Sequence, residues 1–530
     1  MKFTKRLASL LVVLCLLFSP VLSSLASAAQ DAAEEEKEPV STWDAQWIWD
    51  KDNSTRYDTW MNFRKTVELD EVPEQVTARI AVDSRYWLYI NGEMVVFEGA
   101  LKRGPTPEDS YYDSVDITKY LHTGTNTIAV QVWYWGRRDG VRSYSNVDSG
   151  QGGFLFEAEL GENCLKSDSS WKVKMDPAHL RDTVYPQPNY RIPESNIMYD
   201  ARLEDENWMQ PDFDDSDWAN ATEYGQAPCA PWNQLYERSI PLLKDFGLKE
   251  YENMDDYRNY TTTAQETLTM KIPYNAQMTP YLKVEAPAGL EIQMTTENTG
   301  IGAVRSTYIT KEGEQEFEAL GWFNGENVNY RIPAGVKIIS LQYRESGYNT
   351  EFEGSFTSDN EFYNKLWQMS LRTLYVTMRD NYMDCPDRER AQWWGDVTNE
   401  MMMMMYSLDE QSYQLYEKGL TSKLGFLDEN TNVLQTVVPI QGDYFELPMQ
   451  ELAGVCGYWE YYLYTGKTDI LEMMYEPSKN YLNLWEMGDN GLVIHRGGSW
   501  DWPDWGSNSD VPALENAWYY KALTAVKQMA

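Results

Sequence analysis

Apolar and polar positions alternate over the first part of the chain, which is the pattern of half-buried β-strands. Residues 77–90 alternate broadly, and Asn91-Gly92 then supplies a strong two-residue hairpin signal before the next apolar run. We therefore predict that residues 43–240 form one elaborated β-sandwich of the jelly-roll type, or two small ones. Later apolar runs, punctuated by Gly and Pro, predict a second β-sandwich over residues 241–355.

The hydrophobic period changes from two to 3.6 residues at Ser358. Ser358 and Glu361 form a capping box, and Phe362, Leu366 and Met369 then recur at helical spacing. The same spacing predicts six helices in the rest of the chain. They cover residues 359–379, 396–407, 410–423, 448–465, 469–486 and 512–529.

Long and short connections alternate between the predicted helices. Long loops follow the first, third and fifth helices, while short links join the second to the third and the fourth to the fifth. This alternation predicts a barrel of helical hairpins whose long loops, including 384–396 and 500–506, share one rim where a pocket can form. Residues 401–405 are five consecutive methionines, so the second helix is apolar on every side and we expect it to be buried.

The first 28 residues have the features of a secretory signal peptide. Three basic residues precede an apolar stretch at 10–25, and Ala26-Ser27-Ala28 is a small-x-small cleavage site. We expect cleavage after Ala28 and a secreted, extracellular protein. Residues 29–42 then form a short acidic linker.

The charge balance excludes some partners. Lys plus Arg is 45 and Asp plus Glu is 82, which gives a net charge of −37 and argues against nucleic acid or an anionic membrane surface. Of the five cysteines, Cys15 lies in the predicted signal peptide, and the other four are too few for a disulfide framework. With three histidines a zinc site is not expected, and we predict no cofactor. We leave open a structural calcium ion, although the sequence has no loop of regularly spaced acidic residues of the kind that binds calcium.

Residues 384–396 carry the densest chemistry in the chain. They read Asp-Cys-Pro-Asp-Arg-Glu-Arg-Ala-Gln-Trp-Trp-Gly-Asp and fall between two predicted helices. Cleavage of a sugar needs one carboxyl group to protonate the glycosidic oxygen, others to hold hydroxyl groups, and an indole to stack on the ring. A solvated charged loop with two core tryptophans would have a similar composition, but the density of reactive groups favours a carbohydrate site.

This loop is similar to the segment Asp-Cys-Pro-x-Arg-Asp-Glu-Arg-x-Gly-Trp-x-Gly-Asp of bacterial α-L-rhamnosidases in glycoside hydrolase family 78. Weaker similarities upstream lie at residues 88–93, 199–202, 214–218 and 238–243. The resemblance implies jelly-roll domains followed by an (α/α)6 six-hairpin barrel over residues 356–530, of which the six predicted helices are the first half. It also implies a rhamnose-containing glycan or glycoside as the carbohydrate substrate.

The resemblance implies a role for each candidate residue. Glu389 corresponds to the general acid of an inverting hydrolysis, Asp384 and Asp396 to carboxylates that hold rhamnose hydroxyls, and Arg388 to a residue flanking the acid. The other implied contacts are a stacking ring, either Trp393 or Trp394, and further sugar contacts at Trp500 and Asp501.

The sequence departs from the family pattern in ways that leave alternatives. The loop is one residue shorter, and Gln392-Trp393 replaces the usual Gly-Trp, so the sugar could be another deoxyhexose, an arabinoside or a uronic acid. The family's general base, a glutamate in the second half of the barrel, has no counterpart, so we expect an incomplete barrel without a base. Asp501, Asp504 or Glu515 would replace it only after rearrangement. A secreted, non-catalytic carbohydrate-binding protein is the other alternative.

Overall fold

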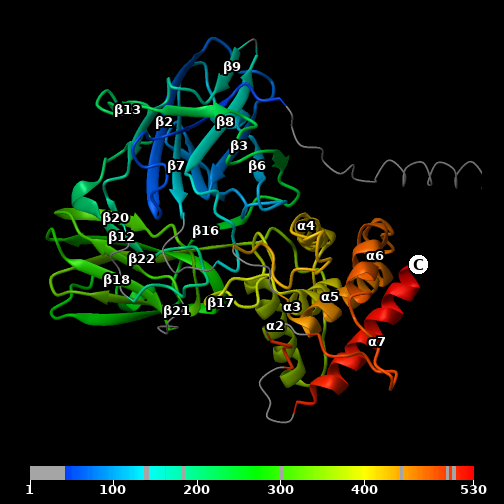
Figure 1. Cartoon of the computed structure of the whole chain (residues 1–530). Helices are drawn as coiled ribbons and strands as arrows, with labels where there is room; N and C mark the ends of the chain where they lie inside the picture. The colour runs from blue at the N-terminus through cyan, green and yellow to red at the C-terminus, as the bar shows by residue number, and fades with distance from the viewer. Residues whose placement is uncertain are drawn as a thin grey trace, which may run out of the picture. The chain divides into compact units, whose positions relative to one another are not determined.

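The computed structural model describes residues 42–530 except 137–142, 162, 182–185, 298–302, 442–445, 497–499 and 504–508 (Figure 1). The predicted signal peptide, its cleavage after Ala28, all but the last residue of the predicted linker, and Asp504 lie outside the described residues. Within them, a mostly β region is followed by a helical region, as predicted.

Two sheets between residues 46 and 237 share one apolar core. The core takes alternate side chains from each sheet, such as Ile80 and Val82 from β3 and Leu88 and Ile90 from β4. The seven-stranded sheet has the order β14 (Thr222–Gln226), β1 (Gln46–Trp49), β8 (Gly153–Leu160), β3 (Thr77–Asp83), β6 (Ser110–Asp116), β15 (Leu235–Glu237), with β9 (Asn163–Lys166) on β8. The six-stranded sheet has the order β13 (Ala219–Asn220), β10 (Lys172–Met175), β2 (Thr59–Leu69), β7 (Gly124–Tyr134), β4 (Arg85–Ile90), β5 (Glu93–Gly99).

The predicted hairpin at Asn91-Gly92 is confirmed. Ile90 of β4 pairs with Glu93 of β5, and both turn residues have positive φ angles, 53° and 80°. Asn and Gly tolerate that conformation, and it gives the turn a twist that matches the two strands. The run 77–90 is two strands instead of one, because the chain leaves the seven-stranded sheet at the end of β3 and enters the six-stranded sheet at the start of β4.

A nine-stranded sheet forms the second β unit. Its order is β11 (His179–Leu180), β12 (Ile197–Asp200), β19 (Ser306–Ile309), β18 (Glu291–Thr296), β21 (Phe323–Ile332), β17 (Glu266–Ala286), β22 (Lys337–Gly347), β16 (Lys244–Glu250), with β20 (Gly313–Glu318) on β17. β11 and β12 come from the range 43–240, yet they pair into this later sheet. Trp87 and Trp133, on the far face of the six-stranded sheet, join its apolar core with Met270 and Leu282. The part of the six-stranded sheet around Trp87 and Trp133 is therefore buried on both faces.

The six predicted helices are confirmed in the described part of the chain. They are α2 (Glu361–Val376), α3 (Trp394–Ser407), α4 (Tyr413–Gly425), α5 (Pro448–Thr465), α6 (Asp469–Leu482) and α7 (Val511–Met529). Pro448 begins α5, where its missing N–H costs nothing, and Gly466 ends it with a φ of 71°. None of the helices in the described ranges combines the length and the apolar character needed to cross a membrane.

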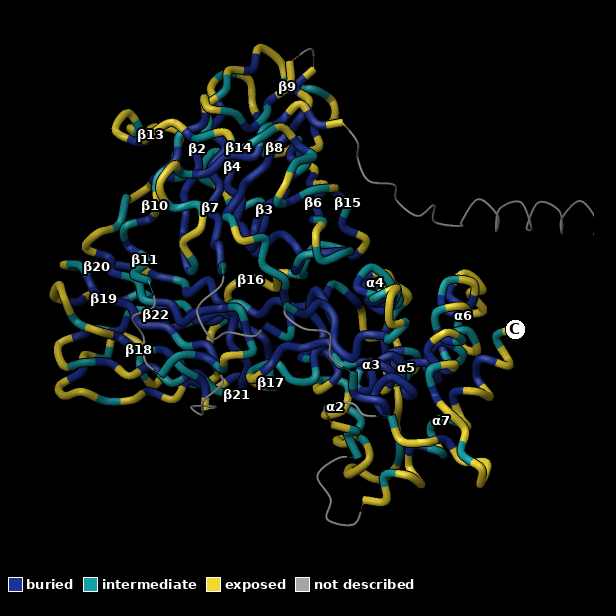
Figure 2. The backbone as a smooth tube through the Cα atoms, in the orientation of Figure 1, coloured by how far each residue is buried: buried dark blue, intermediate teal, exposed yellow. Residues whose placement is uncertain are grey.

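Several apolar side chains expected in the helical core are exposed instead. On α2 the predicted apolar face of Phe362, Leu366 and Met369 is 65%, 48% and 58% exposed. On α3 the expectation of complete burial is wrong, because Met403 is 47% exposed although Met401 is fully buried. Figure 2 shows exposed residues along α2 and α7. The period of the sequence identified the apolar face correctly but could not show that the described residues leave it uncovered.

Candidate active site

The acidic loop 384–396 connects α2 to α3 and is closed by its own backbone. The Asp384 N–H donates to the Ala391 carbonyl over 2.8 Å, and the Ala391 N–H donates to the Asp384 carboxylate over 3.1 Å. Between them the chain turns at Arg390, whose φ of 53° is in the left-handed region. Glu389 is therefore held between two fixed points of one compact turn.

Glu389 is buried, with 3% of its surface exposed, and both of its carboxylate oxygens have partners. Oε1 lies 3.0 Å from the Arg388 guanidinium and also pairs with Arg191. Oε2 accepts a hydrogen bond from the indole N–H of Trp393 over 3.1 Å. Both oxygens of Glu389 are thus held in place beside an indole that offers a flat apolar surface.

Arg191 brings the β region into the site. It belongs to the segment before β12 and lies 198 residues away from Glu389 in the chain. Its guanidinium also covers the Tyr144 ring at 5.2 Å, and Tyr144 meets the Trp393 ring edge-on at 5.7 Å. No local pattern around Arg191 or Tyr144 could have signalled this role, because it arises only from the tertiary fold.

Three further carboxyl groups influence one another around Glu389. Burial, and then the charge of Glu389, raise the pKa of Asp384 to about 7. Asp396, in the first turn of α3, accepts a hydrogen bond from the Gln450 amide over 3.1 Å. One turn later, burial and the charges of Asp396 and Asp384 raise the pKa of Glu400 well above its usual range. We did not single out Glu400 from the sequence, although its i, i+4 spacing from Asp396 offered a signal.

The two adjacent tryptophans lie in different environments. Trp393 is half-buried and contacts Glu389 and Tyr144. Trp394 is fully buried in the helical core, where the Lys423 ammonium lies 4.5 Å from its ring centroid. Of the two rings that were candidates for stacking on a sugar, the structure leaves exposed surface only on Trp393.

Buried ion pairs fix the loop to the β region. Arg390 is 1% exposed and pairs with Glu194 over 3.0 Å. It also donates to the Trp322 carbonyl over 3.1 Å, and its guanidinium lies 3.4 Å from the centroid of the Trp322 ring. Removing one member of such a pair leaves an uncompensated buried charge, so the pair fixes the position of the residue next to Glu389.

A second buried anchor lies just before the loop, at Asp380. Burial alone would raise the pKa of Asp380, but the charges of Arg85, Lys102 and Lys418 outweigh it and hold this pKa well below the usual range. The Lys102 ammonium also donates to the Arg390 carbonyl over 3.2 Å. Cations from the β region and from α4 thus position both ends of the segment that carries Glu389.

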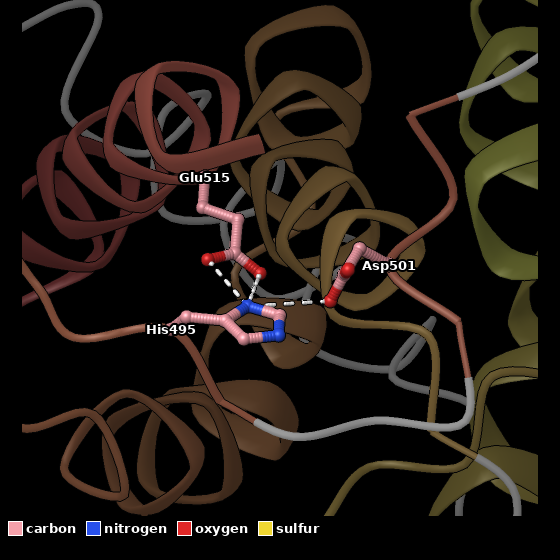
Figure 3. A group of neighbouring side chains, drawn as sticks. All are labelled: His495, Asp501 and Glu515. Carbon is pink, nitrogen blue, oxygen red and sulfur yellow. Dashed lines mark hydrogen bonds and ion pairs between the residues drawn. The ribbon is translucent and has the colours of Figure 1, made fainter. Parts of the chain in front are cut away.

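The structure places Asp501 in a different group of side chains. Asp501 pairs with His495 over 3.4 Å, and His495 also contacts Glu515 of α7 (Figure 3). Trp500 is 41% exposed. Both residues lie in the predicted second rim loop 500–506, of which residues 504–506 are outside the described residues. Figure 3 shows His495 with Nδ1 directed between the two carboxylates, so the group could hold a metal ion.

Two family models match the chain. The model described as the α-L-rhamnosidase N-terminal domain matches residues 71–240, and the one described as the bacterial α-L-rhamnosidase six-hairpin glycosidase domain matches residues 351–530. The second match begins just before α2 and includes the loop 384–396, so it covers every candidate residue of the site except Arg191 and Tyr144.

Curated and solved relatives agree with these models. An α-L-rhamnosidase of Formosa agariphila is 23% identical over 519 residues, which is 88% of this chain and 52% of that protein. A GH78 family rhamnosidase of Bacillus sp. GL1 has a similar structure, with a TM-score of 0.79 and 18% identity over 92% of this chain and 74% of that one. The α-L-rhamnosidase of Streptomyces avermitilis, solved with L-rhamnose, has a TM-score of 0.70 and 18% identity, covering 89% of this chain and 46% of that one. The chain spans about half the length of three curated α-L-rhamnosidases that it matches.

Proposed function

The chain belongs to the bacterial α-L-rhamnosidases of glycoside hydrolase family 78, and we propose that its loop 384–396 binds a terminal α-L-rhamnoside with Glu389 as the proton donor. One observation carries this proposal: Glu389 is buried, held through both oxygens, and joined by a hydrogen bond to the half-buried ring of Trp393. The L-rhamnose in the complex of the Streptomyces avermitilis enzyme supports this choice of sugar.

In this mechanism Glu389 protonates the glycosidic oxygen as the bond to the sugar breaks. The positive charge that develops on the ring carbon and oxygen is stabilised by the surrounding carboxylates. Trp393 supplies a flat apolar surface for the sugar ring, and its indole N–H fixes the rotamer of the acid. The side chain of Arg388 is 62% exposed, so it has room to turn toward a substrate hydroxyl when the sugar enters.

Asp384 and Glu389 are neighbouring acids of one loop. Burial, and then the charge of Glu389, raise the pKa of Asp384 to about 7. We assign the proton-donating role to Glu389, whose carboxyl group lies beside the half-buried ring of Trp393. Asp384 in its ionised form accepts a hydrogen bond from a rhamnose hydroxyl, and Asp396 accepts another.

Inversion requires a second carboxylate across the sugar, at about 6.5–9.5 Å from the acid, to activate water. The resemblance places this base in the second half of the barrel, and we propose that residues 1–530 do not supply it. We also propose that α2 to α7 are half of an (α/α)6 barrel. The exposed apolar side chains on α2 and α3, which further helices would cover in a closed barrel, support this arrangement.

The test is to assay purified protein on aryl α-L-rhamnosides with and without sodium azide, an anionic nucleophile that needs no base. We expect no multiple turnover in water, and slow azide-dependent cleavage. Glu389→Gln should lower that cleavage by about 10²–10⁴-fold for a poor leaving group, and much less for a good one that departs without a proton.

Each outcome addresses one part of the proposal. Multiple turnover in water that Glu389→Gln removes would place a base within 1–530 and refute its absence. Equal losses for good and poor leaving groups would refute Glu389 as the acid. Binding of another sugar in preference to rhamnose would refute rhamnose as the substrate. The location of the sugar site in the loop 384–396 would not be affected.

A further inference from the structure

A second group of ligand atoms lies outside the loop 384–396. The His495 Nδ1 atom lies 3.0 Å and 3.1 Å from the two oxygens of Glu515 and 3.4 Å from an Asp501 oxygen (Figure 3). One ligand atom from each of the three residues lies within 4.8 Å of the others. Ligand atoms bound at about 2.0–2.2 Å around a tetrahedral ion are roughly 3.3–3.6 Å apart. The His–carboxylate distances are within a few tenths of an ångström of this separation, and the carboxylate oxygens of Asp501 and Glu515 lie within 4.8 Å of each other, so an ion would draw the three ligands closer together.

Glu515 is a buried carboxylate without a Lys or Arg partner in the described part of the chain. Its side chain is 1% exposed, and within the described residues no ion pair joins Lys or Arg to Glu515 or to Asp501. Asp501 and Glu515 are two carboxylates that face one imidazole, and a buried carboxylate such as Glu515 is usually paired with a cation or bound to a metal ion.

The backbone holds His495 against α7. The Val493 N–H donates to the Asn516 side-chain oxygen over 2.8 Å, and the Ile494 N–H donates to the Glu486 carbonyl over 2.8 Å. Asn516 is the neighbour of Glu515 on the helix, so the contact that fixes the chain at Val493 also sets the distance from His495 to Glu515. His495 and Glu515 are thus positioned before any ion binds.

We propose that His495, Asp501 and Glu515 form a binding site for a divalent transition-metal ion, with Zn²⁺ as the best fit. One imidazole nitrogen and two carboxylate oxygens suit zinc, whereas calcium prefers six to eight oxygen ligands. The exposure increases from buried Glu515 through Asp501 to exposed His495, which leaves an access path and an open position for water on the exposed side. The site joins the loop after α6 to α7, and zinc binding there does not depend on the proton-donor role proposed for Glu389.

The test is calorimetric titration of the purified, untagged full chain with zinc chloride and, separately, calcium chloride. We expect one equivalent of zinc and no comparable calcium binding. His495→Ala and Glu515→Gln should each weaken zinc binding by more than about 100-fold, which exceeds the loss of roughly 10–100-fold typical of a supporting group. His122→Ala is the matched control, because His122 is an exposed histidine whose ring is hydrogen-bonded locally, to Thr123, and the variant should bind zinc like wild type.

Two additions keep the result decisive. Asp501→Asn changes a partly exposed loop residue, so weaker zinc binding by a folded Asp501→Asn variant would show that the loss does not come from unfolding. Cobalt(II) bound in place of zinc should give a visible spectrum without a thiolate charge-transfer band, because no cysteine belongs to the site. Absence of stoichiometric zinc binding, binding unchanged in His495→Ala and Glu515→Gln, tighter binding of calcium, or a thiolate band would each overturn the proposal.

Discussion

Trp393 and Trp394 are adjacent in the chain, and substitutions at these two positions should separate an effect on sugar binding from an effect on stability. Trp394 is fully buried among Tyr416, Tyr458 and Lys423, so Trp394→Ala removes a large ring from a closed core. Such a truncation costs about 3–5 kcal/mol. Trp393 is half-buried and donates a hydrogen bond to Glu389, which is typically worth about 1 kcal/mol.

The assay is urea denaturation followed by the helical circular dichroism signal, together with titration by L-rhamnose. With a slope of about 2–3 kcal/mol per molar urea, Trp394→Ala should lower the midpoint of the helical transition by about 1–2.5 M. Trp393→Ala should lower it much less, and it should weaken rhamnose binding. The reasoning is refuted if the two variants have the same midpoint, or if Trp394→Ala folds like wild type.

Three further predictions concern the anchor of the loop, its proton and the start of the chain. Glu194→Gln leaves buried Arg390 without its counter-charge and should destabilise the helical region by about 3–5 kcal/mol, whereas Glu285→Gln, in an exposed pair with Lys337, should cost less than about 1 kcal/mol in the same melt. Because the pKa of Asp384 is raised in the folded protein, its stabilising contribution is full below pH 4 and is lost as the pH rises to about 7. The unfolding free energy of Asp384→Asn should therefore fall less between pH 4 and about 7 than that of wild type. Plots of unfolding free energy against pH that run parallel for the two proteins would contradict this. Sequencing of secreted protein should begin at residue 29, and a full-length protein kept in the cytoplasm would contradict the signal peptide.

The helices could be predicted well because their ends carry local signals. Pro448 at the start of α5 and Gly466 at its end act within one turn of the chain, and sequence patterns report such effects directly. The capping box predicted at Ser358 is wrong, because the side chain of Asn360, two residues later, caps α2 by accepting from the Phe362 N–H. The predicted span of α5 agrees with the structure residue for residue. Burial was harder, because Phe362 and Met403 lie on apolar helix faces whose covering depends on distant parts of the fold.

The site could be predicted only in part, for a related reason. The loop motif placed Glu389, Asp384, Asp396 and Trp393 in one segment, and the structure brings their side chains into one group. Arg191 reaches the acid from 198 residues away, and a contact of that kind leaves no mark on the local pattern. Asp501 was assigned to the sugar by resemblance, and that contact stays a prediction; the structure shows Asp501 paired with His495, a partner that the sequence pattern did not indicate.

The most direct test of the proposed sugar site is calorimetric titration of wild type and Trp393→Ala with L-rhamnose, with L-arabinose and L-fucose as comparison sugars. We expect wild type to bind one equivalent of rhamnose in preference to the other two sugars. Trp393→Ala should bind rhamnose at least about tenfold more weakly, a loss of about 1.4 kcal/mol, while its melting curve shifts far less than that of Trp394→Ala. Rhamnose binding that Trp393→Ala leaves unchanged, or no rhamnose binding by folded wild type, would contradict the claim that the loop 384–396 is the sugar site.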